Sequence, residues 1–337
     1  MRRANSICTL EFENHRPLYN WFCQTLGIYN PRQIEFARLN LNYCLTSKRK
    51  CLQLVNEGIV DGWNDPRMAT ICGMRRRGIP ASAIRDFCET IGVTKFNSLT
   101  EIELLDHCVR NDLNKTARRA MAVMNPLKLV IDNYPEGQVE QVETVNNPED
   151  PAAGSRMVPF SKTLYIERDD FMENPVKQFH RLAVGKEVRL RSAYFVTCTS
   201  FVKDASGEIV ELHATYDPAT KGGNAPDGRK VKGTIHWVSA DQSLEAEVRL
   251  YDKLFTVPDL SALPEDADWK SCLNPDSLKV VKCRIEPGLA ELPPATHVQF
   301  ERVGYFFSDP KDHAADHPVF NRTVALKDSW AKIAKKA

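Results

Sequence analysis

The spacing of apolar residues changes about a third of the way along the chain, and this change constrains the fold more than any other feature. Before it, apolar residues recur at helical spacing. Ile84, Phe87 and Ile91 lie on one predicted helix, which ends at Gly92. After it, apolar and polar residues alternate in short runs typical of strands, with turn signals such as the predicted hairpin turn 205–207 between them. A helical region followed by one or two antiparallel β-barrels is therefore the predicted fold.

Two further patterns place individual elements. The run Thr100–Glu103 has the composition of a capping box, in which a hydroxyl and a carboxylate satisfy free amide groups at the start of a helix. An apolar stripe at helical spacing follows it and ends at Leu113. Eight alternating runs are predicted strands: 127–131, 164–166, 188–202, 209–216, 231–238, 248–255, 278–285 and 298–307.

Charge gives a weak indication of a partner. The 45 Lys+Arg and 44 Asp+Glu residues give a formal net charge of +1. Residues 1–125 hold 18 basic and 12 acidic residues, a net of +6, so the remaining residues carry −5. A basic N-terminal third is typical of a segment that faces a polyphosphate, although chance scatter of surface charge explains it equally well.

Cysteine spacing and apolar run length exclude other classes. The ten cysteines form no C-x-x-C pair, so we expect no zinc ribbon, no protein-bound metal and a reduced, cytoplasmic protein. No run of 18 apolar residues occurs, so we expect no membrane association through a spanning helix. The start Met1–Asn5 has two arginines but no apolar core after them, unlike a secretory signal.

Three clusters of polar residues are candidates for chemistry. The run Thr46–Lys50 carries three cations and two hydroxyls, which are suited to stabilising negative charge on a phosphate, although short basic runs are also common on solvated surfaces. The three adjacent arginines 75–77 cannot share one helix face. For them, phosphate contact and internal pairing with Asp61 and Asp65 are equally supported.

The third cluster lies in the predicted strands. Arg189 and Arg191 alternate with Leu190, so both guanidinium groups should project from one face while Val188 and Leu190 point inward. With nearby Gln, His, Arg and aromatic residues, this pattern is typical of contact with unstacked RNA bases. Ordinary polarity of a strand surface is the alternative.

Taken together, the chain resembles a bacterial-type glutaminyl-tRNA synthetase, a class I aminoacyl-tRNA synthetase. The resemblance rests on many collinear motifs that run nearly the whole length of the chain. These motifs are Ser6–Phe12, Pro31–Gln33, Arg38–Leu41, Thr46–Lys50, Gly62–Met68, Arg76–Gly78, Arg119–Val123, Lys128–Ile131, Gly228–Gly233, Ile235–Ser239 and Val319–Val324.

The resemblance implies an α+β multidomain fold and roles for particular residues. Thr46-Ser47-Lys48 corresponds to the loop that closes on ATP, with Lys48 as the catalytic residue that stabilises the transition state of adenylation, and Thr46 replaces the usual Met. Thr9, Arg38 and Leu39 correspond to further ATP-contacting positions. The segment predicted to meet the inner corner of the tRNA is Thr94, Lys95, Phe96, Asn97, Ser98, Leu99, Thr100 and Glu101. The positions predicted to contact the anticodon are Arg119, Gln178, His180, Arg181, Arg189, Arg191, Gln299 and Arg302, where His180 stands in place of the usual Lys.

The resemblance also implies a missing part and a domain division. No His-x-Gly-His signature of the Rossmann half occurs, so we interpret the chain as a C-terminal portion of the family. Residues 1–35 would be a remnant of the catalytic domain, and 36–118 the helical stem-contact region. Residues 119–337 would form the anticodon-binding region, with a proximal barrel of about 119–170 plus 256–337 and a distal barrel of about 171–255. Trp21, Phe22 and Leu26 should then face solvent.

The expected activity is that of a glutamine–tRNA ligase, which joins glutamine to tRNA(Gln) through an adenylate with ATP and Mg²⁺. We expect the isolated chain to be a monomer and to be inactive, because half of the ATP site and the glutamine pocket would lie outside it. A tRNA-binding module without catalysis is the first alternative. A glutamyl-tRNA synthetase with the same barrels is a weaker alternative, because the stretches 119–130 and 227–239 look more glutaminyl.

Overall fold

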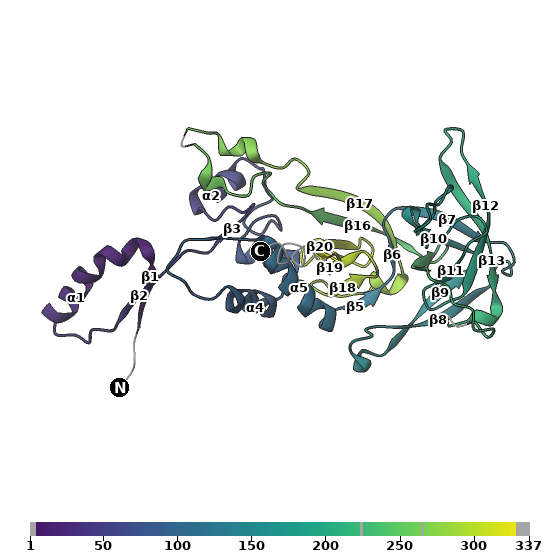
Figure 1. Cartoon of the computed structure of the whole chain (residues 1–337), viewed down its shortest axis with the longest axis horizontal. Helices are drawn as coiled ribbons and strands as arrows, with labels where there is room; N and C mark the ends of the chain where they lie inside the picture. The colour runs from purple at the N-terminus through teal and green to yellow at the C-terminus, as the bar shows by residue number, and fades with distance from the viewer. Residues whose placement is uncertain (1–4, 223–224, 265, 328–337) are drawn as a thin grey trace.

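The computed structural model describes residues 5–222, 225–264 and 266–327. The first residues of the predicted remnant 1–35 and the last residues of the predicted region 119–337 therefore lie outside the described part. The molecule is elongated, with a small N-terminal unit at one end and a β-barrel at the other (Figure 1). Short 3₁₀ helices punctuate the loops: η1 (Leu10–His15), η2 (Pro151–Ala153), η3 (Arg168–Asp170), η4 (Pro218–Thr220), η5 (Leu260–Ala262), η6 (Trp269–Cys272) and η7 (Pro287–Leu289). Within the described ranges, none of the helices combines the length and apolar character needed to cross a membrane.

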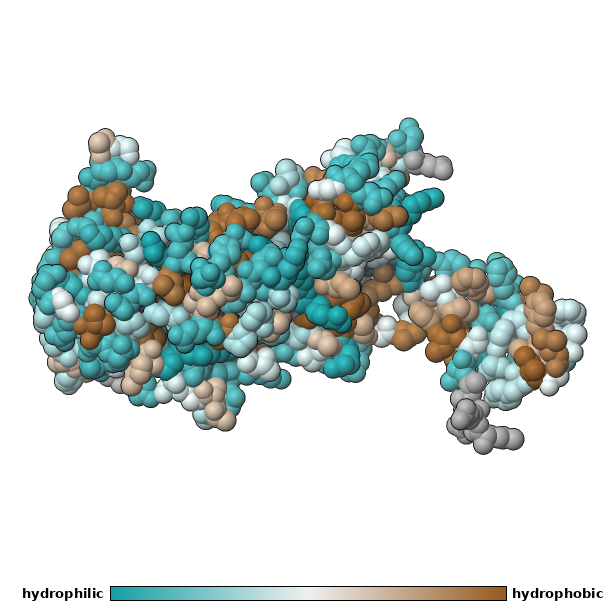
Figure 2. All heavy atoms as spheres, turned by 180° about the vertical axis from the view of Figure 1, so that it is seen from behind, coloured by the Kyte–Doolittle hydropathy of each residue, from teal (hydrophilic) through white to brown (hydrophobic). Residues whose placement is uncertain are grey.

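The N-terminal unit comprises residues 5–36. Strand β1 (Ser6–Thr9) pairs in parallel with β2 (Gln33–Phe36), and α1 (Arg16–Thr25) lies in the connection between them. Cys23 is the one apolar residue of α1 that is buried. The exposed fractions of Trp21, Phe22 and Leu26 are 55%, 50% and 65%, which confirms that these side chains face solvent. In Figure 2, brown apolar residues lie on the surface of this unit, at the right of the view.

The helical region follows. It contains β3 (Asn40–Leu41), α2 (Lys48–Asn56), α3 (Ile71–Arg77), α4 (Ala81–Ile91), β4 (Leu99–Thr100) and α5 (Ile102–Thr116). The helix predicted from the apolar spacing before Gly92 is confirmed as α4, which ends at that glycine. The glycine at 78 ends α3 in the left-handed region (φ 89°) and lies so close to the second barrel that a Cβ there would approach the Cβ of Phe307 to 2.5 Å.

The capping box predicted at Thr100–Glu103 is wrong, although the helix itself is present. Helix α5 begins after Glu101, whose side chain makes no capping hydrogen bond. The Oδ1 atom of Asn42 instead accepts the Ile102 amide at 2.7 Å, and Glu103 pairs with Lys253 at 2.5 Å. A residue distant in the sequence therefore supplies the cap, which local composition cannot reveal.

The first barrel is a seven-stranded sheet with the order β14-β11-β12-β13-β7-β10-β15. Its outer strands, β14 and β15, are two pieces of one segment interrupted at His236, so this segment closes the sheet on itself. A separate hairpin of β8 and β9 packs against the same core, which contains Phe160 and Trp237. The strands are β7 (Pro126–Ile131), β8 (Val139–Val145), β9 (Ser155–Ser161), β10 (Thr163–Glu167), β11 (Glu187–Leu190), β12 (Phe195–Lys203), β13 (Ile209–Asp217), β14 (Thr234–Ile235) and β15 (Trp237–Ser239).

The second barrel has the order β5-β18-β19-β20-β16-β17-β6 and closes in the same way, through a segment interrupted at Met121. Residues of this segment alternate between the two cores. Met121 and Val123 belong to the first barrel's core, and Ala120 and Ala122 to the second's. The strands are β5 (Arg118–Ala120), β6 (Ala122–Val123), β16 (Leu244–Tyr251), β17 (Leu278–Ile285), β18 (His297–Phe300), β19 (Gly304–Ser308) and β20 (Val319–Ala325).

The two barrels confirm the predicted fold class, with three differences in detail. The sheets are mixed, because β13 pairs in parallel with β7 and β20 with β16. The predicted runs 188–202, 231–238 and 298–307 are each two strands. The sheets also divide the chain differently from the predicted proximal and distal barrels, because β7 and β10 pair with strands of residues 209–239. The first barrel therefore spans 126–239 and lies between the two parts of the second barrel in the sequence.

Candidate ATP- and tRNA-binding sites

Lys48 stands at the first position of α2. The N-cap residue Ser47 makes no side-chain capping bond, and Lys48 has no ion-pair partner within the described ranges. Residues 46–49 are exposed. Three cations at a helix N-terminus, where the helix dipole is also positive, repel one another and favour an anion there.

The other predicted ATP-contacting residues lie around three adjoining hollows that share Arg38. One hollow is lined by Thr46 and Ser47, and another by Thr9 and Leu39. The third is lined by Glu11, whose Oε1 atom is 2.6 Å from an Nη atom of Arg38. A hydrogen bond from the Thr9 hydroxyl, with smaller contributions from Arg38, lowers the pKa of Glu11. The structure thus brings together five of the six predicted residues, and Lys48 directly follows Ser47.

The segment 94–101 lies beside these hollows. Leu99 and Thr100 pair in parallel with β3, and the Ala37 amide donates to the Thr94 carbonyl at 2.8 Å. Asn97 and Ser98 each line a hollow that Arg38 also lines. The exposed fraction of Phe96 is 81%. The segment is therefore held at both ends and presents its middle to solvent next to the candidate nucleotide site.

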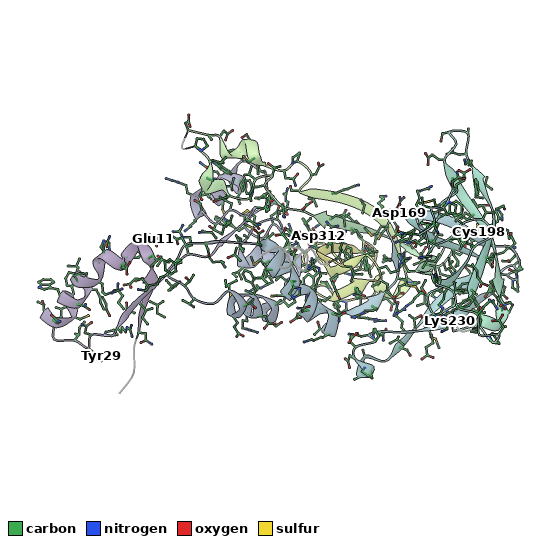
Figure 3. The ribbon with its side chains drawn as sticks, in the orientation of Figure 1. Glu11, Tyr29, Asp169, Cys198, Lys230 and Asp312 are labelled. Atoms are coloured by element: carbon green, nitrogen blue, oxygen red, sulfur yellow. The ribbon has the colours of Figure 1, made fainter. Side chains whose placement is uncertain are left out.

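Three predicted anticodon residues meet where the barrels contact each other, at residues we call the junction network. Asp170 accepts two hydrogen bonds from Arg302, both 2.7 Å, and lies 3.3 Å from Nε of Arg181. Nε of Arg191 is 2.9 Å from a carboxylate oxygen of Glu301. The neighbouring Asp169 marks this junction in Figure 3. The network consists of Glu167, Asp170, Arg181, Arg191, His236, Glu301 and Arg302.

His236, the residue that interrupts the closing segment of the first barrel, also belongs to the network. Its Nδ1 atom is 3.3 Å from Nη1 of Arg302, and its Nε2 atom is 3.4 Å from Glu167. Burial opposes the ionisation of Glu167, but the nearby His236 and hydrogen bonds from the amides of Met124 and Asn125 outweigh it and lower the pKa of Glu167. This carboxylate therefore stays charged, and it links the closing segment of the first barrel to the contact between the two barrels.

Two other predicted anticodon residues are buried. Arg119 donates to the carbonyl oxygens of Ala117 and Asn114, at 2.7 and 2.9 Å, and so caps the C-terminus of α5. Gln299 lies beside it in the strand register, and its side chain is also covered. The structure places both residues at the join between α5 and the second barrel, not in the junction network.

The remaining predicted anticodon residues lie on the first barrel. The guanidinium group of Arg189 lies 5.2 Å from the ring centroid of Phe195, and Val188 and Leu190 are buried, as the alternation predicts. Gln178 and His180 are exposed on the loop before β11. At His180 the loop packs closely on residue 233, since a Cβ there would collide with the His180 carbonyl.

The arginine run 75–77 shows internal ion pairing at its central member. Arg76 is buried and pairs with Asp61, Asp309 and Asp312 at 3.2, 3.1 and 2.9 Å. Asp65 pairs with Arg67 at 2.7 Å instead of with this run. The ion pairs of Arg76 join the helical region to the second barrel.

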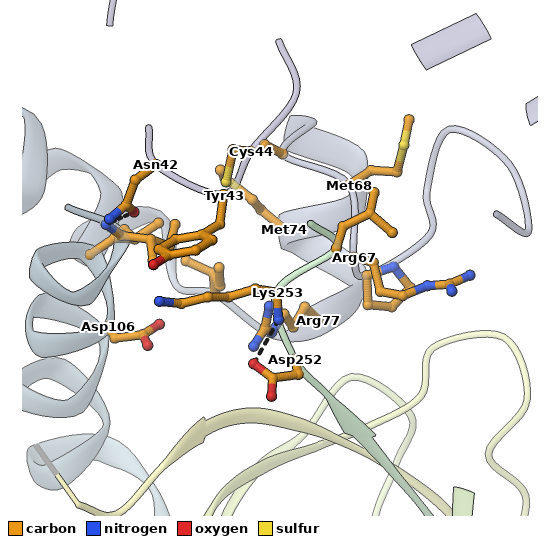
Figure 4. Close-up of a pocket in the computed structure, with 16 residues that line it drawn as sticks. Asn42, Tyr43, Cys44, Arg67, Met68, Met74, Arg77, Asp106, Asp252 and Lys253 are labelled. Carbon is orange, nitrogen blue, oxygen red and sulfur yellow. Dashed lines mark hydrogen bonds between the residues drawn. The ribbon is translucent and has the colours of Figure 1, made fainter. Parts of the chain in front are cut away.

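A further pocket lies between the helical region and the second barrel (Figure 4). In it, Nζ of Lys253 stands 3.7 Å from the Tyr43 ring centroid, and the Lys253 amide donates to Asp252 at 2.7 Å. Burial raises the pKa of Asp106. None of the residues predicted for ATP or tRNA lines this pocket.

Sequence analysis missed the acidic half of the junction network. Asp170 and Glu301 are almost fully buried, although nothing in their local sequence separates them from surface carboxylates. A buried acid needs a cationic partner, and the partners of these two come from other parts of the chain. The described residues contain no group of three or more His, Cys, Asp or Glu side chains arranged to hold a metal ion.

Comparison with protein families agrees with this architecture. Three models of class I tRNA synthetases (E and Q) match the chain: the catalytic domain over residues 1–115, and two anticodon-binding domain models over 117–217 and 234–309. The chain therefore belongs to the class I tRNA synthetases of the E and Q type.

Within that family the chain is a homologue of glutamine–tRNA ligases. It is 55% identical to the enzyme of Bradyrhizobium diazoefficiens over 335 residues, which are 99% of this chain and 59% of that protein. It is 56% identical to that of Nitrobacter hamburgensis over 332 residues, 98% of this chain and 59% of the relative. For Rhodopirellula baltica the identity is 54% over 331 residues, 98% and 55% of the two chains. The chain thus spans less than three-fifths of the length of these relatives.

Proposed function

We propose that this chain is the tRNA-holding portion of a glutamine–tRNA ligase and recognises the anticodon of tRNA(Gln). The match to two anticodon-binding domain models carries the proposal. The junction network supports it, because three partly exposed arginines converge between the barrels. Guanidinium groups offer forked donors to base edges and phosphates.

We further propose that Thr9, Arg38, Leu39, Thr46, Ser47 and Lys48 contact ATP. Lys48 would place positive charge against the phosphate on which negative charge develops during adenylation, and Mg²⁺ accompanying ATP would share that charge. The adjoining hollows and the exposed cations at the start of α2 support this assignment. The segment 94–101 would contact the inner corner of the tRNA beside the nucleotide.

A tRNA-binding assay tests the first proposal. Filter binding of tRNA(Gln) should weaken steeply with salt and should depend on the anticodon. Arg189→Ala and Arg302→Ala should each cost about 1–3 kcal/mol of binding and relax that dependence. Lys282→Ala is the control, because it removes an exposed cation on β17 that pairs with Glu245. Binding that ignores the anticodon in the unmodified protein, or variants that bind like the control, would refute anticodon recognition by the barrels.

One activity measurement and one binding measurement separate the remaining alternatives. The chain spans 59% of its relatives, so we propose that alone it binds tRNA without forming adenylate. ATP–pyrophosphate exchange with glutamine and tRNA should then stay at background, and exchange above background would overturn this. Equal binding of tRNA(Glu) and tRNA(Gln) would favour the glutamyl alternative.

A further inference from the structure

Asp170 is a buried acid at the contact between the barrels. It is the last residue of η3, which directly follows strand β10 of the first barrel, and its exposed fraction is 0%. Both of its carboxylate oxygens face cations. Arg302 donates one hydrogen bond to each oxygen at 2.7 Å, and Nε of Arg181 lies 3.3 Å from Oδ1. One carboxylate from the first barrel therefore holds an arginine from each barrel.

The backbone conformation of Arg302 favours its pairing with Asp170. Arg302 lies in the turn between β18 and β19 with φ at 67°, in the left-handed region that residues other than glycine rarely adopt. The Val303 amide closes the turn on the Phe300 carbonyl at 2.9 Å. A residue in this conformation costs free energy, and the bidentate pair with a buried carboxylate offsets it. The turn thus directs the Arg302 side chain across to the first barrel.

The paired arginines keep donors free. Arg302 uses both Nη atoms on Asp170, while its Nε has no hydrogen-bond partner among the described residues. The same holds for Nη2 of Arg181 and for both Nη atoms of Arg191. The side chains of Arg302, Arg181 and Arg191 are 30%, 45% and 41% exposed. Each guanidinium group thus faces a carboxylate on one side and solvent on the other.

We propose that Asp170 is a positioning residue for anticodon recognition. It fixes the guanidinium groups of Arg302 and Arg181 so that their remaining N–H groups meet the edge of an unstacked anticodon base. Glu301 lies 2.9 Å from Nε of Arg191 and acts on it through charge alone, since no hydrogen bond joins the two side chains. This inference rests on the tRNA-binding function proposed above. An arginine held in place loses less conformational entropy on binding than a free one, and its direction selects among base edges.

A second ion pair shows what a purely structural role would look like. Nε and Nη2 of Arg156, on β9, donate to the two carboxylate oxygens of Glu286 at 2.6 and 3.0 Å. Glu286 directly follows β17, is almost fully buried and also accepts the Met121 amide. This pair likewise joins the first barrel's hairpin to the second barrel. No residue predicted to contact the anticodon bonds to it, so it is a matched control for loosening of the barrels.

The experiment compares Asp170→Asn with Glu286→Gln in the full chain. For each variant, the dissociation constant is measured for tRNA(Gln) and for the same tRNA with an altered anticodon, at one salt concentration. We define the ratio as the dissociation constant for the altered tRNA divided by that for tRNA(Gln). Asp170→Asn should lower this ratio by roughly tenfold, within the range for one lost bidentate contact. Glu286→Gln should leave the ratio unchanged. Urea unfolding shows that both variants are folded.

Two outcomes would overturn the inference: an unchanged ratio in Asp170→Asn, or an equal loss in Glu286→Gln. If Asp170→Asn does not fold, Asp170→Glu replaces it. That variant keeps the charge and displaces the guanidinium groups, so the ratio should fall while the salt dependence of binding stays the same. An unmodified protein that does not discriminate anticodons would instead contradict the proposed function itself, and so the two failures are distinguishable.

Discussion

The N-terminal unit and the two barrels stabilise themselves in opposite ways. In the barrels, large side chains such as Trp237 and Phe306 are fully buried. In the N-terminal unit, most apolar side chains face solvent, and the best-covered group is a carboxylate, Glu35, with 1% exposure. Glu35 is covered by Arg16 and Gln33, which both donate hydrogen bonds to it.

The barrels bury their apolar side chains in their own cores, whereas the N-terminal unit leaves most of its apolar side chains exposed. Burial of apolar surface is the main stabilising contribution in globular domains, whereas exposed ion pairs contribute little. The exposed patch on the N-terminal unit consists of Ile7, Phe12, Leu18, Trp21, Phe22, Leu26, Ile28, Tyr29 and Ile34. We therefore expect the two regions to respond differently to the same kind of substitution.

The largest difference should come from removing an aromatic ring in each region. Phe306 is fully buried and stacks on Phe300 with ring centroids 4.1 Å apart. Phe306→Ala should lower the free energy of unfolding by about 3–5 kcal/mol, because it leaves a cavity. Trp21→Ala, at a half-exposed site, should change it by less than about 0.5 kcal/mol. Urea unfolding followed by circular dichroism measures both, and equal effects would remove the distinction between the regions.

Ion pairs should show the same contrast. Arg76 is buried among three aspartates, so Arg76→Met should destabilise the protein by about 3 kcal/mol, because Asp309 loses a partner inside the protein. Arg38→Ala breaks an exposed pair with Glu11 and should leave the unfolding midpoint unchanged. The same urea titration decides. A shift of the midpoint in Arg38→Ala would show that exposed pairs matter here.

A local effect is expected at Arg16. Arg16→Ala removes the cation that covers Glu35, so the N-terminal unit should open more often while the barrels are unaffected. Hydrogen exchange of amides in residues 6–36 should become severalfold faster, without change in the barrel strands. Lys95→Ala, which removes an exposed cation 3.6 Å from Glu13, is the control. Unchanged exchange in Arg16→Ala would show that other contacts hold the unit.

The smallest expected effect is a dependence on pH. The hydrogen bond from Arg16, with that of Gln33, lowers the pKa of Glu35 from 4.5 to about 2. A carboxylate with a lowered pKa stabilises the folded state above its unfolded pKa, and the contribution is lost as pH falls through the folded value. Cleavage of the N-terminal unit by pepsin should therefore accelerate between pH 4.5 and 2. In Arg16→Ala this acceleration should be smaller.

Sequence patterns predicted elements wherever local residues decide the structure. Helix α4 and its end at Gly92, and the inward side of β11, follow from spacing alone. The hairpin of β8 and β9 was missed, because Val139, Val142 and Val145 recur at a spacing of three and imitate a helix. The division into barrels and the cap of α5 were also wrong, since both depend on partners more than 30 residues away.

The candidate site shows the same difference between features set by local residues and features set by distant contacts. Motif resemblance brought together residues that the structure places around shared hollows and at the contact between the barrels. It could not distinguish Arg302, with free donors toward solvent, from Arg119, which is buried as a helix cap. The carboxylates that hold the arginines were absent from the prediction, because burial is a property of the folded chain.

The segment Arg118–Val123, which closes the second barrel, has a consequence for the order of folding. This short segment closes the second barrel and contributes to both cores, yet its partners β17 (Leu278–Ile285) and β18 (His297–Phe300) follow far later in the chain. Contacts between distant residues form late, because a long loop must close first. We therefore expect the first barrel to assemble first on the ribosome, with the segment held on it and ready as a template for β17 and β18. Pulse-labelled hydrogen exchange during refolding should protect β12 and β13 of the first barrel before β18 and β20 of the second. The reverse order would show that the second barrel forms before the first.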